Sequence, residues 1–403
     1  MQDTIADKII LECSSCGREY TAEQVDYLCP VCSIRNTADS PPAGVLKTLY
    51  NYAVIMQKSA GNLFRALADR GFIDLLPINS RTSLSYLRVG NTPLYQIDCT
   101  EKDVPPHKLL FKDDSQNPTY SYKDRASNLV SAIARERGIN TIIVASTGNA
   151  GSSMAGIGTA QGQKIIILVP EKAPLAKLVQ IAAYGAVIIP VKGSYDDAFE
   201  LSMQVTAELG IYNRNTAFNP FTIEGKKTAA LEIYAQMGEE IPDRIFVPVG
   251  DGCIIAGIYK GFEDLLRLGI INALPEIVAV RAENPNTIAD SISVKIPRNY
   301  NLAEQYIQTY QGKNLTVTDE EILQAGKNLA AGYGLFSEPA AAAAYAGYIK
   351  YRTEYQIEEN SRNVVLLTGS GLKDIKAVSA GLKLPESINP TLAEFKARLS
   401  LQR

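Results

Sequence analysis

Short apolar runs alternate with longer amphipathic segments through the middle of the chain. The apolar runs are rich in β-branched residues, as buried strands are, and each is followed by apolar positions at helical spacing. Strands that alternate with helices in this way pair in parallel, and helices cover both faces of their sheet. The predicted strands are 141–145, 165–169 and 187–191, and the predicted helices include 154–160, 174–184 and 196–209. We expect a small α/β domain over residues 126–225.

A second set of elements lies on both sides of this domain in the sequence. A helix is expected over residues 45–76, where leucine and valine recur at roughly helical spacing. The other predicted strands or extended segments are 91–95, 109–112, 245–249, 277–281 and 364–367, with helices over 254–268 and around 319–357. A larger domain would therefore be assembled from residues 41–125 and 226–403.

The composition removes several classes of protein. The 403 residues carry a formal net charge of −3, which gives no general attraction to nucleic acid or to an anionic membrane. No run of about eighteen apolar residues is present, and the first residues lack a basic and then apolar signal, so we expect a soluble, cytoplasmic protein. The single histidine, His107, lies beside two prolines and is expected at the surface. Ser-His-Asp triads and His-rich catalytic metal sites are therefore not serious candidates.

Four of the six cysteines lie near the start of the chain, as two Cys-x2-Cys pairs separated by twelve residues. Each pair can place two thiolates on one ion, and two pairs complete the tetrahedral site that zinc prefers. The candidate ligands are Cys13, Cys16, Cys29 and Cys32. We predict a zinc-ribbon-like segment over residues 1–40 with a structural zinc ion; the alternative is a ribbon that keeps its fold without the metal. Cys99 and Cys253 are expected to be simple core residues.

Residues 118–125 join an irregular segment to an amphipathic helix expected over 126–137, and Lys123 lies at the junction. A lysine at the start of a helix feels the positive end of the helix dipole, which disfavours its charged form. An amine that is easily neutralised is what covalent catalysis on a carbonyl compound requires. Taken alone this is a weak signal, because most Lys-Asp-Arg triplets are solvated surface charge.

Three strand-to-helix turns rich in small residues follow the lysine. Backbone N–H groups left free at such a turn converge on one point and can bind a carboxylate or a phosphate. The turns are 146–151, 248–254 and 366–374. Each also has a plain structural interpretation: an ordinary turn between strand and helix for the first two, and a helix N-cap for Thr368. Together with Lys123, the turns favour a bound cofactor.

The lysine loop and these turns, in this order, resemble the threonine synthase branch of the fold-type II pyridoxal phosphate enzymes, which are similar to tryptophan synthase β. That family's lysine motif usually reads Gly-Ser-Phe-Lys-Asp-Arg, and residues 120–125 read Tyr-Ser-Tyr-Lys-Asp-Arg. The resemblance implies an α/β fold of two three-layer α/β/α domains with open, mostly parallel sheets, after the zinc-ribbon-like segment. It also implies that Lys123 attaches pyridoxal 5′-phosphate and then acts as the general base at the substrate Cα.

The resemblance assigns further residues to the cofactor and the substrate. Asn149 would meet the phenolic oxygen of the cofactor ring and Thr368 the ring nitrogen, and Glu338 falls in a segment near the family's active site. The implied cofactor-phosphate loop is Gly250, Asp251, Gly252, Cys253 and Ile254, and the implied substrate-binding residues are Ser146, Thr147, Gly148, Asn149 and Ala150. Asp251 and Cys253 depart from the family pattern. Because a carboxylate repels a phosphate dianion, we expect Asp251 to point away or to meet a cation.

The implied reaction is that of a threonine synthase, a lyase that converts O-phosphohomoserine and water to L-threonine and phosphate by γ-elimination and β-addition. In the family an arginine of an Asn-Pro-x-Arg-x-Glu-Gly segment helps to hold the substrate phosphate, and this chain has Thr222 in its place. Arg214, Lys226 and Lys227 are candidates to compensate.

Two alternatives remain for the function. The first is a β-replacement enzyme, such as a cysteate synthase acting on O-phosphoserine, or another amino-acid β-eliminating enzyme. The second is a catalytically inactive binding protein anchored by the zinc ribbon, which the joint presence of Lys123, Asn149 and Thr368 disfavours. By analogy with relatives we expect a homodimer that acts on a small-molecule amino acid.

Overall fold

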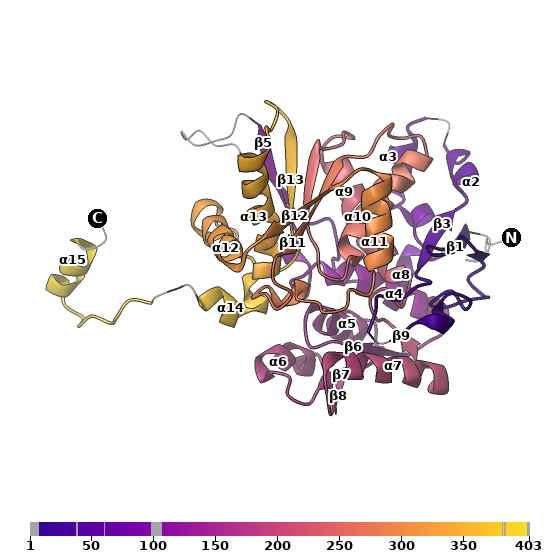
Figure 1. The fold of residues 1–403 in the computed structure, drawn as a ribbon, viewed down its shortest axis with the longest axis horizontal. Helices are drawn as coiled ribbons and strands as arrows, with labels where there is room; N and C mark the ends of the chain where they lie inside the picture. The colour runs from indigo at the N-terminus through magenta and orange to yellow at the C-terminus, as the bar shows by residue number, and fades with distance from the viewer. Residues whose placement is uncertain are drawn as a thin grey trace.

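The computed structural model describes residues 8–37, 39–59, 61–97, 107–380, 382 and 384–400, and its strands form three sheets (Figure 1). The largest sheet has six strands in the order β12-β11-β10-β13-β5-β4, and all neighbours are parallel except β4 and β5. Its strands are β4 (Leu94–Gln96), β5 (Lys108–Asp113), β10 (Arg244–Pro248), β11 (Glu276–Ala282), β12 (Lys313–Val317) and β13 (Arg362–Leu367). Segments from both sides of residues 126–225 therefore share one sheet.

Helices cover both faces of this sheet (Figure 1). On one face lie α12 (Asp319–Tyr333) and α13 (Pro339–Glu354), whose alanine-rich turns pack closely on the strands. On the other face lie α9 (Thr228–Gln236), α10 (Cys253–Arg267) and α11 (Tyr300–Thr309). The strands are buried on both faces and read as continuous apolar runs, as parallel strands do.

The second sheet has four parallel strands in the order β8-β7-β6-β9. Its strands are β6 (Thr141–Ala145), β7 (Lys164–Pro170), β8 (Val187–Val191) and β9 (Tyr212–Asn213), and its helices are α4 (Lys123–Glu136), α5 (Asn149–Ala160), α6 (Leu175–Ala183) and α7 (Tyr195–Leu209). Helix α7 packs on one face through Ala198 and Phe199. Both sheets are open and mostly parallel, so the predicted α/β fold class is confirmed.

A small antiparallel sheet at the N-terminal end corrects one prediction. Its strands are β1 (Ile9–Cys13), β2 (Glu19–Tyr20) and β3 (Leu46–Tyr50), in the order β2-β1-β3. The helix expected over residues 45–76 is wrong at its start, because Leu46, Thr48 and Tyr50 alternate inward with the period of a strand. Only two short helices follow, α2 (Tyr52–Met56) and α3 (Leu63–Asp69). The sheet also crosses the expected domain boundary at residue 40.

His107 gives a second correction. It was expected at the surface, yet it is buried, and its Nε2 lies 2.8 Å from the hydroxyl oxygen of Tyr348 on α13. The neighbouring prolines suggested a loop but carried no information about this distant partner. Cys253 is buried as expected, whereas Cys99 lies outside the described residues.

The remaining helices are α8 (Phe221–Lys226), α14 (Ile375–Ser379) and α15 (Leu392–Ser400). Helix α8 packs between α4 and α10 and so joins the two larger sheets. Within the described ranges, no helix is both long enough and apolar enough to cross a membrane.

Candidate active site

The carboxyl ends of three neighbouring parallel strands, β5, β13 and β10, bring the lysine loop and two of the small-residue turns together. The turn after β6 reaches the same place from the smaller sheet. The lining residues of the pocket between them are Tyr122, Lys123, Asn149, Pro248, residues 250–254, Ser291, Ile292, Glu338, Ala340 and Thr368. Six segments that are far apart in the sequence thus form one pocket.

The loop that carries Lys123 is held against the turn after β13. Ser121 forms an antiparallel bridge with Gly369, and the Tyr122 N–H donates to the carbonyl oxygen of Thr368 at 2.8 Å. Tyr120 adopts a φ of 69°, in the left-handed region where the family motif has glycine. Tyr120 therefore holds a backbone conformation that glycine adopts more readily.

The two residues after Lys123 are buried and fix the start of helix α4. The Asp124 carboxylate accepts from the Thr119 N–H at 2.7 Å and from the Thr119 hydroxyl. The Arg125 guanidinium pairs with Asp114 at 2.6 Å and with Glu232 at 2.7 Å. The Lys-Asp-Arg triplet is therefore a packed core feature, and its surface interpretation is wrong.

The Lys123 side chain is half-buried and lines the pocket. Burial lowers the pKa of its amine, while the negative charge of Asp251 acts in the opposite direction. A lowered pKa leaves more of the amine neutral near pH 7, which suits a nucleophile or a general base.

Asn149 opens helix α5 and is 7% exposed. Its Nδ2 donates to the two carboxylate oxygens of Glu338 at 3.0 and 3.1 Å, and it lies 3.3 Å from the Ser291 hydroxyl. Burial raises the pKa of Glu338. The sequence resemblance implied a contact between the Asn149 amide and an oxygen of the cofactor ring. In this structure the amide donates to Glu338, which lines the same pocket.

The turn after β10 has the form of an anion cradle. Gly252 has a φ of 84°, and among the described residues no side chain caps the helix α10 that follows it. Its first N–H groups therefore point to the pocket end of the helix, where an anion is stabilised. An added Cβ at Gly250 would come within 2.7 Å of the Ile292 Cα, so that position must stay glycine. The Asp251 Oδ1 accepts from the Arg298 backbone N–H at 3.1 Å, and Asp251 also lines the pocket.

A larger cavity of about 370 Å³ adjoins the pocket and shares Lys123, Asn149, Asp251 and Ser291 with it. All five predicted substrate-binding residues, Ser146, Thr147, Gly148, Asn149 and Ala150, line it. Within the described part of the chain, a Cβ added at Gly148 would meet no atom within 4 Å, so this turn faces open space. The turn is therefore accessible to a ligand in the larger cavity.

Arg214 lines the same cavity and was only a secondary candidate from the sequence. Its guanidinium is fully buried and has hydroxyl contacts to Ser127 and Thr216, both at 3.2 Å. Burial lowers the pKa of Arg214 to about 10. Among the residues that the structure describes, no carboxylate forms an ion pair with it, so its charge is available to an anionic ligand.

These residues fit pyridoxal phosphate. A half-buried amine, Lys123, can attach an aldehyde, the uncapped turn at 250–254 can hold a phosphate, and the Thr368 hydroxyl can meet a pyridine nitrogen. Every predicted cofactor and substrate residue lines one of the two adjoining cavities.

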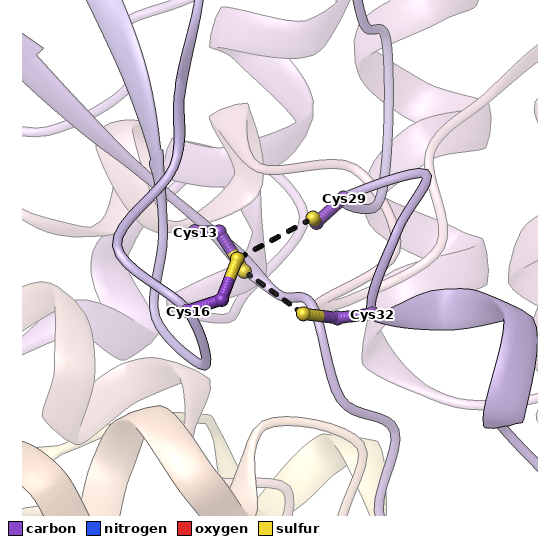
Figure 2. Close-up of side chains that lie close together, drawn as sticks. All are labelled: Cys13, Cys16, Cys29 and Cys32. Atoms are coloured by element: carbon purple, nitrogen blue, oxygen red, sulfur yellow. Dashed lines mark hydrogen bonds between the residues drawn. The ribbon is translucent and has the colours of Figure 1, made fainter.

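The four N-terminal cysteines also converge, as Figure 2 shows. Their sulfur atoms all lie within 4.8 Å of one another, with Cys13 Sγ to Cys32 Sγ at 3.8 Å and Cys16 Sγ to Cys29 Sγ at 4.0 Å. Four thiolates at about 2.3 Å from a tetrahedral zinc ion are about 3.8 Å apart. Gly17, with a φ of 70°, makes the tight turn after the first pair. The cluster therefore has the geometry of a closed zinc site.

Known proteins resemble this chain along nearly its whole length. Residues 86–369 match the family described as pyridoxal-phosphate dependent enzyme. The threonine synthase of Methanocaldococcus jannaschii is 35% identical, over 94% of this chain and 96% of that protein. The threonine synthase of Methanosarcina acetivorans is 33% identical, over 91% of this chain and 93% of that protein.

Solved structures show the same fold at lower identity. O-ureido-L-serine synthase matches with a TM-score of 0.63 and 19% identity, over 77% of this chain and 97% of that one. Threonine deaminase isoform 2 from Solanum lycopersicum matches with a TM-score of 0.59 and 19% identity, over 85% and 89% of the two chains. The chain therefore belongs to the pyridoxal-phosphate dependent enzyme family, as a fold-type II lyase of the threonine synthase group.

Proposed function

We propose that this enzyme is a threonine synthase that converts O-phosphohomoserine and water to L-threonine and inorganic phosphate. The observation that carries the proposal is the position of Lys123, which occupies the family's lysine position and shares a pocket with the uncapped turn before α10 and with Thr368. The similarity to threonine synthases over more than nine tenths of the chain supports the same substrate.

We assign the proton transfers to the Lys123 amine. When bound, pyridoxal phosphate disperses the negative charge that develops at the substrate Cα after a proton leaves. Lys123 takes that proton, because burial lowers the pKa of its amine and favours the neutral, basic form. Thr368 would hold the ring nitrogen and residues 250–254 the cofactor phosphate. The turn before α5 would receive the substrate α-carboxylate through its free N–H groups.

The substrate phosphate needs a cation, and Arg214 is the best placed one. Thr222, at the family's arginine position, is fully buried, and its hydroxyl donates to the Asn219 carbonyl oxygen at 2.9 Å, so it cannot contribute. Arg214 faces the cavity that the 146–150 turn also lines. Its planar guanidinium can donate two parallel hydrogen bonds to a phosphate. We therefore propose that Arg214 takes the place of the family's arginine.

The proposal is tested by product analysis of the cofactor-loaded enzyme. It is offered O-phosphohomoserine or O-phosphoserine, each with and without sulfite, and released phosphate and amino-acid products are quantified. We expect equal amounts of phosphate and threonine from O-phosphohomoserine, independent of sulfite.

The second candidate function is β-replacement, which the absence of arginine at position 222 favours. Cysteate formed from O-phosphoserine only in the presence of sulfite would establish it, and no turnover of O-phosphohomoserine would exclude a threonine synthase. A protein that acquires no visible cofactor absorbance, or whose absorbance persists in Lys123→Ala, would exclude both enzymes.

We also propose that Cys13, Cys16, Cys29 and Cys32 hold a structural zinc ion. Four thiolates leave no open coordination position, so the ion would stabilise the fold and take no part in the chemistry. Metal analysis of the purified protein should find stoichiometric zinc, and Cys16→Ser should lose it. A metal-free protein with unchanged melting temperature would contradict this role. The homodimer, the cytoplasmic location and the boundaries of the three domains stay predictions.

A further inference from the structure

Lys226 is a buried cation that the reaction described above does not use. It is the last residue of helix α8, and its side chain is fully buried. The Tyr122 hydroxyl, one residue before Lys123, donates to the Lys226 carbonyl oxygen at 2.7 Å. On the other side, an added Cβ at Gly257 would lie 2.6 Å from the Lys226 Cβ. Lys226 is thus held between the lysine loop and the second turn of helix α10.

The ammonium group of Lys226 is unpaired. Within the described residues its Nζ has no hydrogen-bond partner. The groups that act on its charge are Cys253, Lys123, Arg214 and Asp251, which surround the turn at the start of α10. Two of these groups are themselves cations. Burial lowers the pKa of Lys226 to about 7. In the protein without a ligand, the protonated form of this amine is therefore destabilised.

The adjacent Lys227 shows what a buried structural lysine looks like in the same segment. Its Nζ lies 2.5 Å from a Glu224 oxygen and 2.6 Å from an Asp264 oxygen. Lys227 therefore has two carboxylate partners, whereas Lys226 has none among the described residues. A buried charge without a partner lowers the stability of the folded state by roughly several kcal/mol. Such a charge persists in proteins where a ligand supplies the partner.

We propose that the Lys226 ammonium is the counter-ion of the cofactor phosphate bound at the start of helix α10. A phosphate dianion at that turn would accept from the free N–H groups at the start of the helix, and the Lys226 ammonium would supply a balancing positive charge. The lysine stem has four rotatable bonds and its head three donors, so it can turn to the phosphate. The added cation also offsets Asp251, the carboxylate that this chain carries within its phosphate turn. The proposal rests on the family's cofactor and is independent of which amino acid is the substrate.

The experiment measures binding of two ligands to the protein freed of cofactor. Wild type, Lys226→Met and Lys227→Met are titrated with pyridoxal 5′-phosphate and with pyridoxal, which lacks the phosphate, by absorbance and by protein fluorescence. We expect Lys226→Met to weaken the binding of pyridoxal 5′-phosphate by about ten- to a hundredfold, which is the effect of losing one hydrogen bond to a charged group. The affinity for pyridoxal should be unchanged. Lys226→Arg, which keeps the charge, should retain most of the affinity.

Thermal unfolding supplies a readout that does not depend on binding. Without cofactor, Lys226→Met should melt at a higher temperature than wild type, since an uncompensated buried charge is removed. The matched Lys227→Met should melt at a lower temperature, because Glu224 and Asp264 lose the lysine that they share and keep only Lys260.

Three outcomes would overturn the proposal: equal losses of pyridoxal and pyridoxal 5′-phosphate affinity in Lys226→Met, an unchanged affinity for both, or a lowered melting temperature of the cofactor-free variant. An unchanged cofactor affinity combined with weaker binding of O-phosphohomoserine would assign Lys226 to the substrate phosphate and would also overturn it. Failure of wild type to bind either ligand would refute the proposed function itself, which separates the two cases.

Discussion

Helix α10 contacts two clusters of buried charge that differ in how their charges are paired. In the paired cluster, Lys227 and Lys260 meet the carboxylates of Glu224 and Asp264. The Tyr50 hydroxyl also donates to Glu224 at 2.5 Å. In the unpaired cluster, Lys123 and Arg214 line the larger cavity and Lys226 is buried near them. In the described part of the chain none of the three forms an ion pair with a carboxylate. Adjacent residues of one segment, 226 and 227, belong to different clusters.

The difference separates what holds the fold from what serves the ligand. The paired cluster joins β3, α8 and α10 and is complete without any ligand, so it fixes how the N-terminal sheet sits on the large domain. The unpaired cluster has no carboxylate partners among the described residues, and two of its cations, Lys123 and Arg214, line the cavity of about 370 Å³. Buried cations without partners are therefore the most informative sign of the site.

The largest expected effect comes from Lys123, the one cation of the unpaired cluster that we propose takes part in the proton transfers. Lys123→Ala should lose activity by at least about a thousandfold, because both the attachment point and the general base are removed. Its visible cofactor absorbance should disappear while the melting temperature of the cofactor-free protein does not fall. Retained activity would show that another amine does the chemistry.

Breaking the paired cluster should damage stability and not the reaction. Lys227→Met should lower the free energy of unfolding by about 3–5 kcal/mol, because it leaves two buried carboxylates with a single lysine, Lys260. Urea denaturation of the cofactor-free protein measures this loss. At a temperature where the variant is folded, its kcat should stay within a few-fold of wild type. A stable but inactive variant would show that Lys227 serves the reaction, and would contradict the assignment of the paired cluster to stability alone.

Arg214 should act on substrate affinity. Arg214→Met is expected to raise KM for O-phosphohomoserine by about ten- to a hundredfold, the value of one lost charge-assisted contact, with a smaller change in kcat. Arg214→Lys should recover only part of the loss, since a lysine lacks the planar fork. Steady-state kinetics with saturating cofactor distinguish the two parameters. A loss confined to kcat would argue against phosphate binding by this residue.

The pH dependence of stability should report on Lys226. Its pKa is lowered from 10.5 to about 7 in the folded, cofactor-free protein, where Cys253, Lys123, Arg214 and Asp251 face it. Below about pH 7 both folded and unfolded chains carry this charge, so the folded state bears the full penalty. Between about pH 7 and 10.5 only the unfolded chain is protonated, so stability rises with pH. The melting temperature of wild type should therefore approach that of Lys226→Met as pH rises; a constant gap would contradict the lowered pKa.

The smallest effect concerns backbone strain in the loop that carries Lys123. Tyr120 has a φ of 69° and is about half exposed. Tyr120→Gly removes a left-handed strain of about 1–2 kcal/mol and costs about 0.5–1 kcal/mol in chain entropy, so the free energy of unfolding should rise by at most about 1.5 kcal/mol. Denaturant titration measures it. A decrease would mean that contacts of the tyrosine ring outweigh the strain.

The sequence predicted the elements whose signal is local. The strand 187–191 matches β8 to the residue, and β6 likewise, because a short β-branched run between turns depends little on distant partners. Strand β3 was mistaken for helix, since Leu46 and Leu49 have helical spacing and only pairing with β1 decides the matter. Domain membership of such a strand is set by a partner more than thirty residues away.

The candidate site was predicted where a motif exists and missed where only three-dimensional surroundings matter. Lys123, Asn149 and Thr368 stand in motifs and do share the pocket. Lys226 and Lys227 are neighbours in sequence with the same chemistry, and nothing local says which one has carboxylate partners. The sequence could therefore name both as candidates but could not choose, because the choice depends on Asp264 in another helix.

The most direct test of the account identifies the lysine that carries the cofactor. Borohydride reduction of the cofactor-loaded protein fixes the cofactor to its lysine, and mass spectrometry of the digested protein then locates the added mass. The lysines at positions 123, 226 and 227 can be told apart by the masses of their peptides or fragment ions. We predict the added mass on Lys123 alone. Its presence on Lys226, whose pKa is near neutral, would contradict the assignment of both residues.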